Sequence, residues 1–137
     1  PHVTGTLTGI TRGTSKGHIA RASLEAIALR SRDIILEMQK DANISFKGLK
    51  VDGGASNNDL LMQIQANVLD ANVIRPKETE TTALGAAFLA GLAVGFWPST
   101  RVLENMWQVD KIFKPEPSDK TQLIIKNWHE RIRKILR

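Results

Sequence analysis

The chain contains no cysteine and few aromatic residues. Without cysteine it can form neither a disulfide framework nor a thiolate metal site. The three histidines lie far apart, at positions 2, 18 and 129, and lack the spacing of zinc ligands. Aromatic residues make up only 5% of the 137 residues, so no platform for stacking bases is visible. We therefore expect neither a metal site nor a nucleic-acid partner.

The sequence also lacks a hydrophobic run long enough to cross a bilayer. The longest run, residues 83–97, is too short for a membrane span and is interrupted by three glycines. We interpret it as a buried helix, with Phe88, Leu89 and Leu92 in the core. No signal peptide is visible, so we expect a cytoplasmic protein without a membrane partner. The first residue is proline rather than methionine, which suggests that the chain starts inside a longer protein.

The positive charge is concentrated near the C-terminus. The net charge is +5, yet residues 1–119 carry 13 basic and 13 acidic side chains. Residues 120–137 carry six basic groups and one acidic group. We predict a terminal amphipathic helix at residues 118–136, capped by Ser118 or Asp119. Cations in its last turns complement the helix dipole, so we interpret them as a solvated face over a core.

The remaining pattern alternates between strands and helices. It predicts strands at residues 4–10, 49–52 and 72–75, and helices at residues 18–40, 57–70 and from residue 81. Pro76 should end the third strand because it cannot extend a ladder. Residues 98–117 resemble an irregular connector. The short joints between strand, helix and strand predict an α/β domain with a parallel pair of strands.

Two glycines join the strand at residues 49–52 to the following helix. Ligands of open α/β sheets bind where strands end and helices begin. Backbone without side chains lets a ligand approach closely, and exposed N–H groups near a helix start favour an anion such as phosphate. Gly53 and Gly54 are therefore a candidate nucleotide cradle, although adjacent glycines more often mark a tight turn.

Longer motifs resemble glycerol kinases, which are carbohydrate kinases with an actin-like, ribonuclease-H-like ATPase fold. The matching segments are residues 9–13 (GITRG), 18–22 (HIARA), 51–55 (VDGGA) with Asn58, 61–65 (LMQIQ) and 81–97 (TTALGAAFLAGLAVGFW). Related xylulose kinases typically carry a third glycine where this chain has Asp52. The resemblance implies that residues 1–137 form the C-terminal part of the second, ATP-binding actin-like domain. It also implies a partial, mixed sheet with flanking helices.

The resemblance assigns roles to three residues. Gly54 matches the family glycine whose backbone lies against the phosphate and ribose of the nucleotide, and Gly53 is expected to shape the turn. Asn58 matches the asparagine at the adenine end, where an amide can donate and accept hydrogen bonds. Capping of the following helix is the alternative role of Asn58. We interpret Asp52 as a residue that caps a neighbouring turn rather than as a metal ligand.

The activity implied by the resemblance is transfer of the ATP γ-phosphate to glycerol, giving glycerol 3-phosphate. Such a transfer requires Mg²⁺, charge neutralisation and a base. In the family, the catalytic aspartate, the glycerol-contacting residues and the phosphate-binding hairpins lie N-terminal to the matching segment. We therefore expect no catalytic residue and no Mg²⁺ ligand in this chain. It should bind ATP or ADP weakly and be inactive alone, whereas the full-length protein should be a homo-oligomer.

Two alternatives to a glycerol kinase stay open. Another sugar kinase of the same family is one, because the residues that select glycerol are not in the chain. The other is a non-catalytic actin-like module that uses the nucleotide, or none, to govern assembly.

Overall fold

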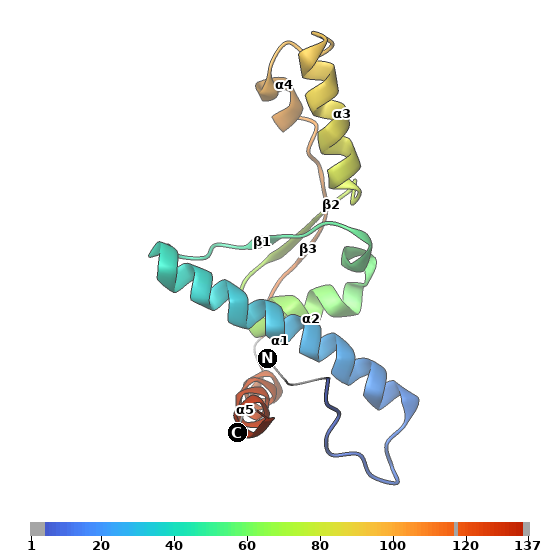
Figure 1. The fold of residues 1–137 in the computed structure, drawn as a ribbon, viewed down its shortest axis with the longest axis vertical. Helices are drawn as coiled ribbons and strands as arrows, with labels where there is room; N and C mark the ends of the chain where they lie inside the picture. The colour runs from blue at the N-terminus through green and yellow to red at the C-terminus, as the bar shows by residue number, and fades with distance from the viewer. Residues whose placement is uncertain (1–4, 117, 136–137) are drawn as a thin grey trace.

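The computed structural model describes residues 5–116 and 118–135. Its elements form two parts (Figure 1). In the first part, which we call the body, three helices lie on the same side of a small sheet. The second part, which we call the arm, consists of residues 81–104 and projects away from the body. The arm contains helices α3 (Thr81–Ala93) and α4 (Thr100–Glu104).

The sheet of the body is mixed, as predicted. Strand β1 (Leu49–Lys50) runs parallel to β2 (Val73–Pro76), which confirms the predicted parallel pair. Strand β3 (Val109–Phe113) pairs antiparallel with the other edge of β2, so that β2 is central. Pro76 is the last residue of β2, as expected for a residue that has no N–H to donate.

Strand β3 lies inside residues 98–117, and the prediction of an irregular connector there is wrong. Val73 of β2 stands opposite Leu49 on one side and Phe113 on the other. Phe113 is buried, while the other four residues of β3 are exposed. Because only one of its five residues is buried, the segment shows no alternation of apolar and polar residues that would predict a strand from sequence. The segment becomes a strand because the open edge of β2 offers it hydrogen-bond partners.

The strand predicted at residues 4–10 is not formed by its described residues, 5–10. Residue 4 lies outside the described residues. Leu7 and Ile10, the apolar positions of the predicted strand, are 61% and 62% exposed. A strand needs a neighbouring strand for its backbone hydrogen bonds, and within the described ranges none lies beside this segment.

The helices of the body follow the predicted pattern. They are α1 (Lys16–Ala42), α2 (Asp59–Leu69) and α5 (Asp119–Ile135), with a short 3₁₀ turn, η1 (Gly54–Asn57), before α2. Ser15 begins α1 with a capping box, in which its side chain accepts from the His18 N–H and the His18 side chain accepts from the Ser15 N–H. The Ser118 hydroxyl accepts from the Thr121 N–H and caps α5, which confirms one of the two predicted caps.

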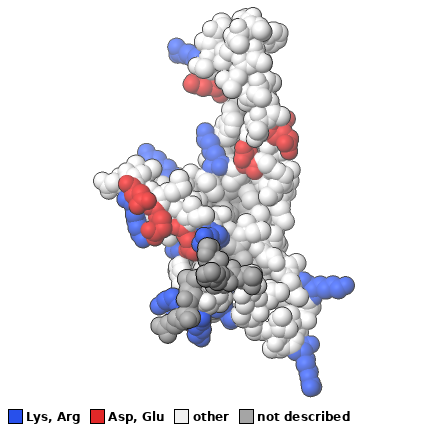
Figure 2. All heavy atoms as spheres, in the orientation of Figure 1, with Lys and Arg blue, Asp and Glu red and all other residues white. Residues whose placement is uncertain are grey.

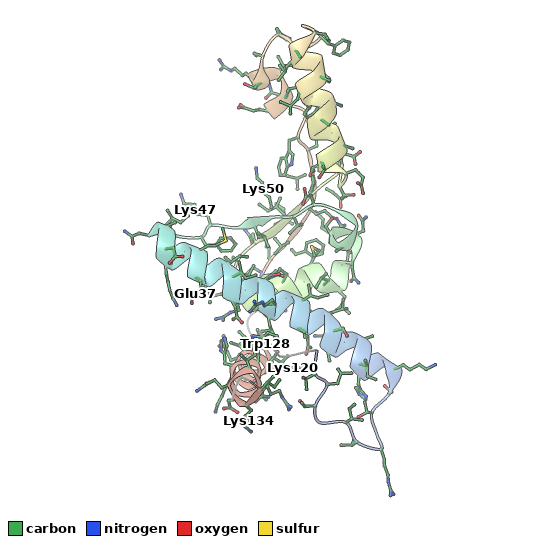
Figure 3. All side chains as sticks on the ribbon, in the orientation of Figure 1. Glu37, Lys47, Lys50, Lys120, Trp128 and Lys134 are labelled. Carbon is green, nitrogen blue, oxygen red and sulfur yellow. The ribbon has the colours of Figure 1, made fainter. Side chains whose placement is uncertain are left out.

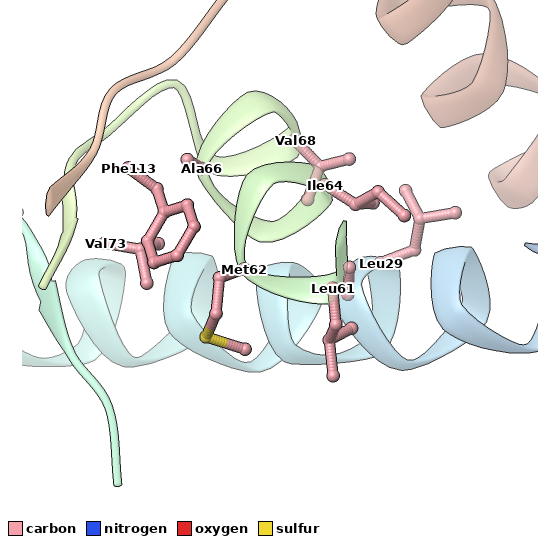
Figure 4. Close-up of a cluster of buried hydrophobic side chains, with 9 residues drawn as sticks. Leu29, Leu61, Met62, Ile64, Ala66, Val68, Val73 and Phe113 are labelled. Atoms are coloured by element: carbon pink, nitrogen blue, oxygen red, sulfur yellow. The ribbon is translucent and has the colours of Figure 1, made fainter. Parts of the chain in front are cut away.

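The core lies between α1, α2 and the sheet (Figure 4). Its buried members are Ala28, Leu29, Leu61, Met62, Ile64, Ala66, Val68, Val73 and Phe113. Helix α5 closes the core from the far side, where Trp128 and two isoleucines pack against it. Figure 3 shows Trp128 on the side of α5 that faces α1 and Lys134 on the opposite side. Asp33 of α1 accepts hydrogen bonds from the Trp128 indole at 2.8 Å and pairs with the His129 ring at 3.1 Å.

The arm is apolar but poorly covered, so the predicted burial of the 83–97 helix is wrong. Leu89 is 71% exposed, and Phe88 and Leu92 are only half-buried. The main cover of α3 is Trp97, whose ring stacks edge-on against Phe88 at 5.2 Å and lies over Gly91. In the described part of the chain, no helix is both long enough and apolar enough to cross a membrane.

Candidate functional site

Gly53 stands at the end of β1 in a backbone conformation that only glycine adopts readily. Its φ is 73° and its ψ is 170°. Its N–H donates to the Thr79 carbonyl at 2.7 Å, and its carbonyl accepts from the Ser56 N–H at 3.0 Å and the Ser56 hydroxyl at 2.7 Å. Gly53 therefore shapes the turn between β1 and η1, and a side chain at this position would strain it.

Gly54 is different, because nothing in the described structure requires a glycine there. Its φ is not positive, and a Cβ built on it meets no atom within 4 Å. The residue is exposed, so its backbone lies open at the surface. Gly54 thus leaves a bare stretch of main chain beside the start of α2.

Asn58 is the N-cap of α2. Its side-chain oxygen accepts a hydrogen bond from the Leu61 N–H at 3.0 Å, so the capping role predicted as the alternative is present. The side chain is exposed, and among the described residues its amide nitrogen has no partner. Asn58 can therefore still donate to a ligand, while its oxygen is already used by the cap.

Arg75 of β2 connects the sheet to the loop that carries these residues. One guanidinium nitrogen, Nη1, donates to the Ser56 carbonyl at 2.9 Å and to the Asp59 carboxylate at 2.7 Å. The other donor, Nε, reaches Asp110 of β3 at 2.8 Å. The Arg75 side chain is only 12% exposed. Sequence reasoning did not identify Arg75, because its three partners lie 16 to 35 residues away.

The ion pairs around Arg75 change the acidity of their members. Lys111 donates to Asp59 at 2.7 Å, and the hydrogen bonds from Lys111 and then Arg75 hold the pKa of Asp59 below its ordinary value of 3.8. The hydrogen bonds to Asp59 and then Asp110 raise the pKa of Arg75 further above its usual range. Both groups therefore stay charged at neutral pH, and the loop is fixed by permanent charges.

Asp52 accepts a hydrogen bond from the hydroxyl of Thr81, the first residue of α3. This contact agrees with the interpretation of Asp52 as a residue that orders a neighbouring turn. Among the described residues, no group of three or more His, Cys, Asp and Glu side chains is arranged to hold a metal ion.

The candidate site is an open surface rather than a closed pocket. A hollow of about 390 Å³ lies between residues 7–14 and the start of α1, and another of about 250 Å³ lies between Thr8 and α5. Neither is lined by Gly53, Gly54 or Asn58. Figure 2 shows Lys and Arg side chains projecting at the lower end of the molecule, and Asp and Glu side chains where the arm joins the body. In this chain, the three predicted site residues thus form one wall of a site at most.

Comparison with known proteins places these features in a family. A family model described as the C-terminal domain of the FGGY family of carbohydrate kinases matches residues 1–94. The chain is 55% identical over 129 residues to glycerol kinase of Deinococcus radiodurans and 57% identical over 129 residues to that of Nitratidesulfovibrio vulgaris. Each alignment covers 93% of this chain and 26% of the relative, so the chain spans about a quarter of their length.

Solved structures show the same relationship. The crystal structure of Plasmodium falciparum glycerol kinase with ADP aligns with a TM-score of 0.82 and 30% identity, over 96% of this chain and 27% of that chain. The ligand-bound xylulose kinase from Lactobacillus acidophilus aligns with a TM-score of 0.73 and 26% identity, over 93% of this chain and 26% of that chain. The fold is therefore that of the actin-like ATPases, of which this chain forms a mixed α/β part.

Proposed function

We propose that this chain, which belongs to the FGGY family of carbohydrate kinases, is the nucleotide-binding C-terminal part of a glycerol kinase. The full-length enzyme would transfer the γ-phosphate of ATP to glycerol and release glycerol 3-phosphate. The identity of 55–57% to glycerol kinases supports this substrate over other sugars. Residues 1–137 would be the last part of the second actin-like domain, and the full-length enzyme would be a homo-oligomer.

Gly54 is the observation that carries the proposal. Gly53 has a structural reason to be glycine, because its φ is positive, but Gly54 has none in the described chain. At the junction between a strand and a helix, where α/β sheets bind their ligands, such a glycine is explained by a ligand that approaches the backbone where a side chain would stand. We assign this place to the phosphate and ribose of ATP or ADP.

The neighbouring residues support a nucleotide at Gly54. Asn58 offers an unpartnered amide donor next to the bare backbone, which suits an acceptor atom of adenine. The start of α2 adds the positive end of a helix dipole beside the same loop. The chain would therefore bind and orient the nucleotide, while the reacting groups come from elsewhere.

Catalysis itself would depend on residues outside this chain. FGGY kinases use ATP, and bound Mg²⁺ would neutralise the charge on its phosphates. The described residues provide no cluster that could hold the ion, so its protein ligands would come from the rest of the enzyme. The base for the attacking hydroxyl would come from there as well. The isolated chain should therefore not phosphorylate glycerol.

The proposal is tested by kinetics of the full-length protein with glycerol and a panel of sugars. We expect glycerol to give the highest kcat/KM, and the variant Gly54→Ala to raise the KM for ATP by about tenfold or more. Gly85→Ala is the matched control, because its Cβ also meets no atom within 4 Å but the residue lies within α3 rather than in the loop. A preference for xylulose or another sugar would instead support the alternative that the enzyme is another sugar kinase of the same family. Absence of any kinase activity, with ADP binding unchanged by Asn58→Ala, would support the non-catalytic module.

A further inference from the structure

The loop with Gly53, Gly54 and Asn58 is held by hydrogen bonds rather than by buried apolar side chains. Its residues are mostly exposed, and Gly54 touches nothing through a side chain. A site that binds a nucleotide with main-chain atoms must keep those atoms in place, because a shift of about 1 Å in a positioning group can cost up to ~100-fold in rate. Some group in the body must therefore fix the loop.

Ser56 is the buried point of this loop. It is 1% exposed, and its hydroxyl donates to the Gly53 carbonyl at 2.7 Å. Its own carbonyl accepts from Arg75 at 2.9 Å. A continuous chain of hydrogen bonds thus leads from β2 through Ser56 to the glycine turn.

Arg75 also holds the loop on the other side of Asn58. The same nitrogen that binds the Ser56 carbonyl binds Asp59, the first residue of α2, at 2.7 Å. Ser56 and Asp59 enclose the two-residue link that contains Asn58. One arginine nitrogen therefore fixes both ends of this link.

The guanidinium geometry explains why an arginine is needed. Nη1 serves the loop while Nε is anchored on Asp110, 2.8 Å away on the neighbouring strand. Phe113 lies beneath, with its ring centroid 5.3 Å from the guanidinium carbon. A lysine has a single nitrogen and cannot hold strand and loop in one plane. If Arg75 is lost, Asp59 still has Lys111 as a partner. The Ser56 carbonyl, in contrast, loses the hydrogen bond that it accepts from Arg75.

We propose that Arg75 is a positioning residue that holds the Gly54 backbone and Asn58 in the geometry that binds the nucleotide. This inference rests on the proposed function of the loop. Arg75 does not touch the nucleotide in this assignment, and it acts through Ser56 and Asp59. Its loss should therefore affect the nucleotide more than glycerol or overall stability.

The test is steady-state kinetics of the full-length kinase with Arg75→Lys and Arg75→Gln. We expect both variants to raise the KM for ATP by about tenfold or more, with the KM for glycerol changed by less than about threefold. Arg75→Lys should not rescue the KM for ATP. Ser56→Ala, a milder change that removes only the hydroxyl bond to Gly53, should raise the KM for ATP by a smaller factor and provides a measurement if the arginine variants do not fold.

Arg32→Gln is the matched control. Arg32 of α1 donates through Nε to the Val68 carbonyl of α2 at 2.8 Å. It therefore also connects two elements of the body, but at the opposite end of α2. We expect it to lower the thermal midpoint without a change in the KM for ATP. Lys111→Gln removes the other partner of Asp59 but leaves both loop bonds of Arg75 in place, so it should raise the KM for ATP by less than Arg75→Gln does.

The outcomes separate this inference from the function on which it rests. If the unchanged enzyme phosphorylates glycerol and Gly54→Ala raises the KM for ATP, but the Arg75 and Ser56 variants do not, the positioning role is wrong and the function stands. An equal effect of Arg75→Gln on ATP and glycerol, or an equal effect of Arg32→Gln on ATP, also refutes it. If the unchanged enzyme has no kinase activity, both proposals fail.

Discussion

Helix α3 of the arm is more apolar in composition than helix α2 of the body, yet it is far less buried. Six of the eleven residues of α2 are buried, whereas the only buried residue of α3 is Gly91. Helix α2 lies between α1 and the sheet, and α3 projects beyond them with α4 as its neighbour (Figure 1). The difference shows that apolar composition favours burial only where the fold supplies an opposing surface. It also divides the chain into a packed scaffold for the loop and an arm with an uncovered apolar face.

The largest expected contrast is between leucines of the two parts. Leu61 of α2 is 5% exposed and Leu89 of α3 is 71% exposed. Leu61→Ala should lower the free energy of unfolding of the 137-residue chain by about 3 kcal/mol, because it leaves a cavity in the core. Leu89→Ala should change it by at most about 0.5 kcal/mol. Urea denaturation measures both, and equal losses would contradict the division into body and arm.

Glycines offer a second contrast, within the arm. A Cβ on Gly91 would lie 2.1 Å from the Trp97 ring, so Gly91→Ala should displace the ring. We expect a loss of about 2 kcal/mol in arm stability and a change in tryptophan fluorescence. Gly85→Ala, on the same helix with no atom within 4 Å, should instead stabilise α3 by up to about 1 kcal/mol. A similar fluorescence change with both variants would show that the clash between the new Cβ at residue 91 and the Trp97 ring is not the cause of the change.

The contacts of Asp33 test how firmly α5 belongs to the body. Asp33→Ala removes the partners of the Trp128 indole and of the His129 ring. The free energy of unfolding should fall by about 1–2 kcal/mol, because a half-buried indole N–H loses its acceptor. Amide hydrogen exchange should become faster in α5 and stay unchanged in α3. Uniform acceleration throughout the chain would argue against a local effect.

The smallest effect concerns the charges that hold the loop. The pKa of Asp59 is lowered in the folded chain, so its ion pairs contribute stability that is present above its ordinary pKa of 3.8. This contribution is lost as the pH falls through the lower, folded-state value. Asp59→Asn should therefore lower stability near neutral pH, where the ion pairs are intact, and make stability depend less steeply on pH below 3.8. Thermal melts between acid and neutral pH measure the slopes, and identical slopes would contradict the lowered pKa.

Local signals in the sequence predicted much of the body. Helical spacing and the caps predicted at Asn58 and Ser118 mark α1, α2 and α5 close to where they lie. The two glycines after a short apolar strand marked the candidate site. These features depend on neighbours within four residues, and the sequence displays them directly.

The errors share one cause, which is that strands and burial depend on partners. Residues 5–10 have a strand-like pattern but no strand beside them, whereas β3 has a weak pattern and pairs with β2. Leu89 is apolar, yet no part of the described chain covers it. The role of Arg75 could not be recognised from sequence, because it depends on hydrogen-bond partners that the sheet brings together from distant segments.

By itself, the sequence determined the helices of the body, the caps of α2 and α5, the family resemblance and the presence of two glycines near Asn58. Only the tertiary structure decided that Gly53 is required by its backbone while Gly54 is not, and that Arg75 holds the loop between them and α2. The physical reason is the distance along the sequence over which each interaction acts. Capping and periodicity act along a few residues of one chain segment, whereas an open backbone and a three-way guanidinium contact exist only when distant segments meet.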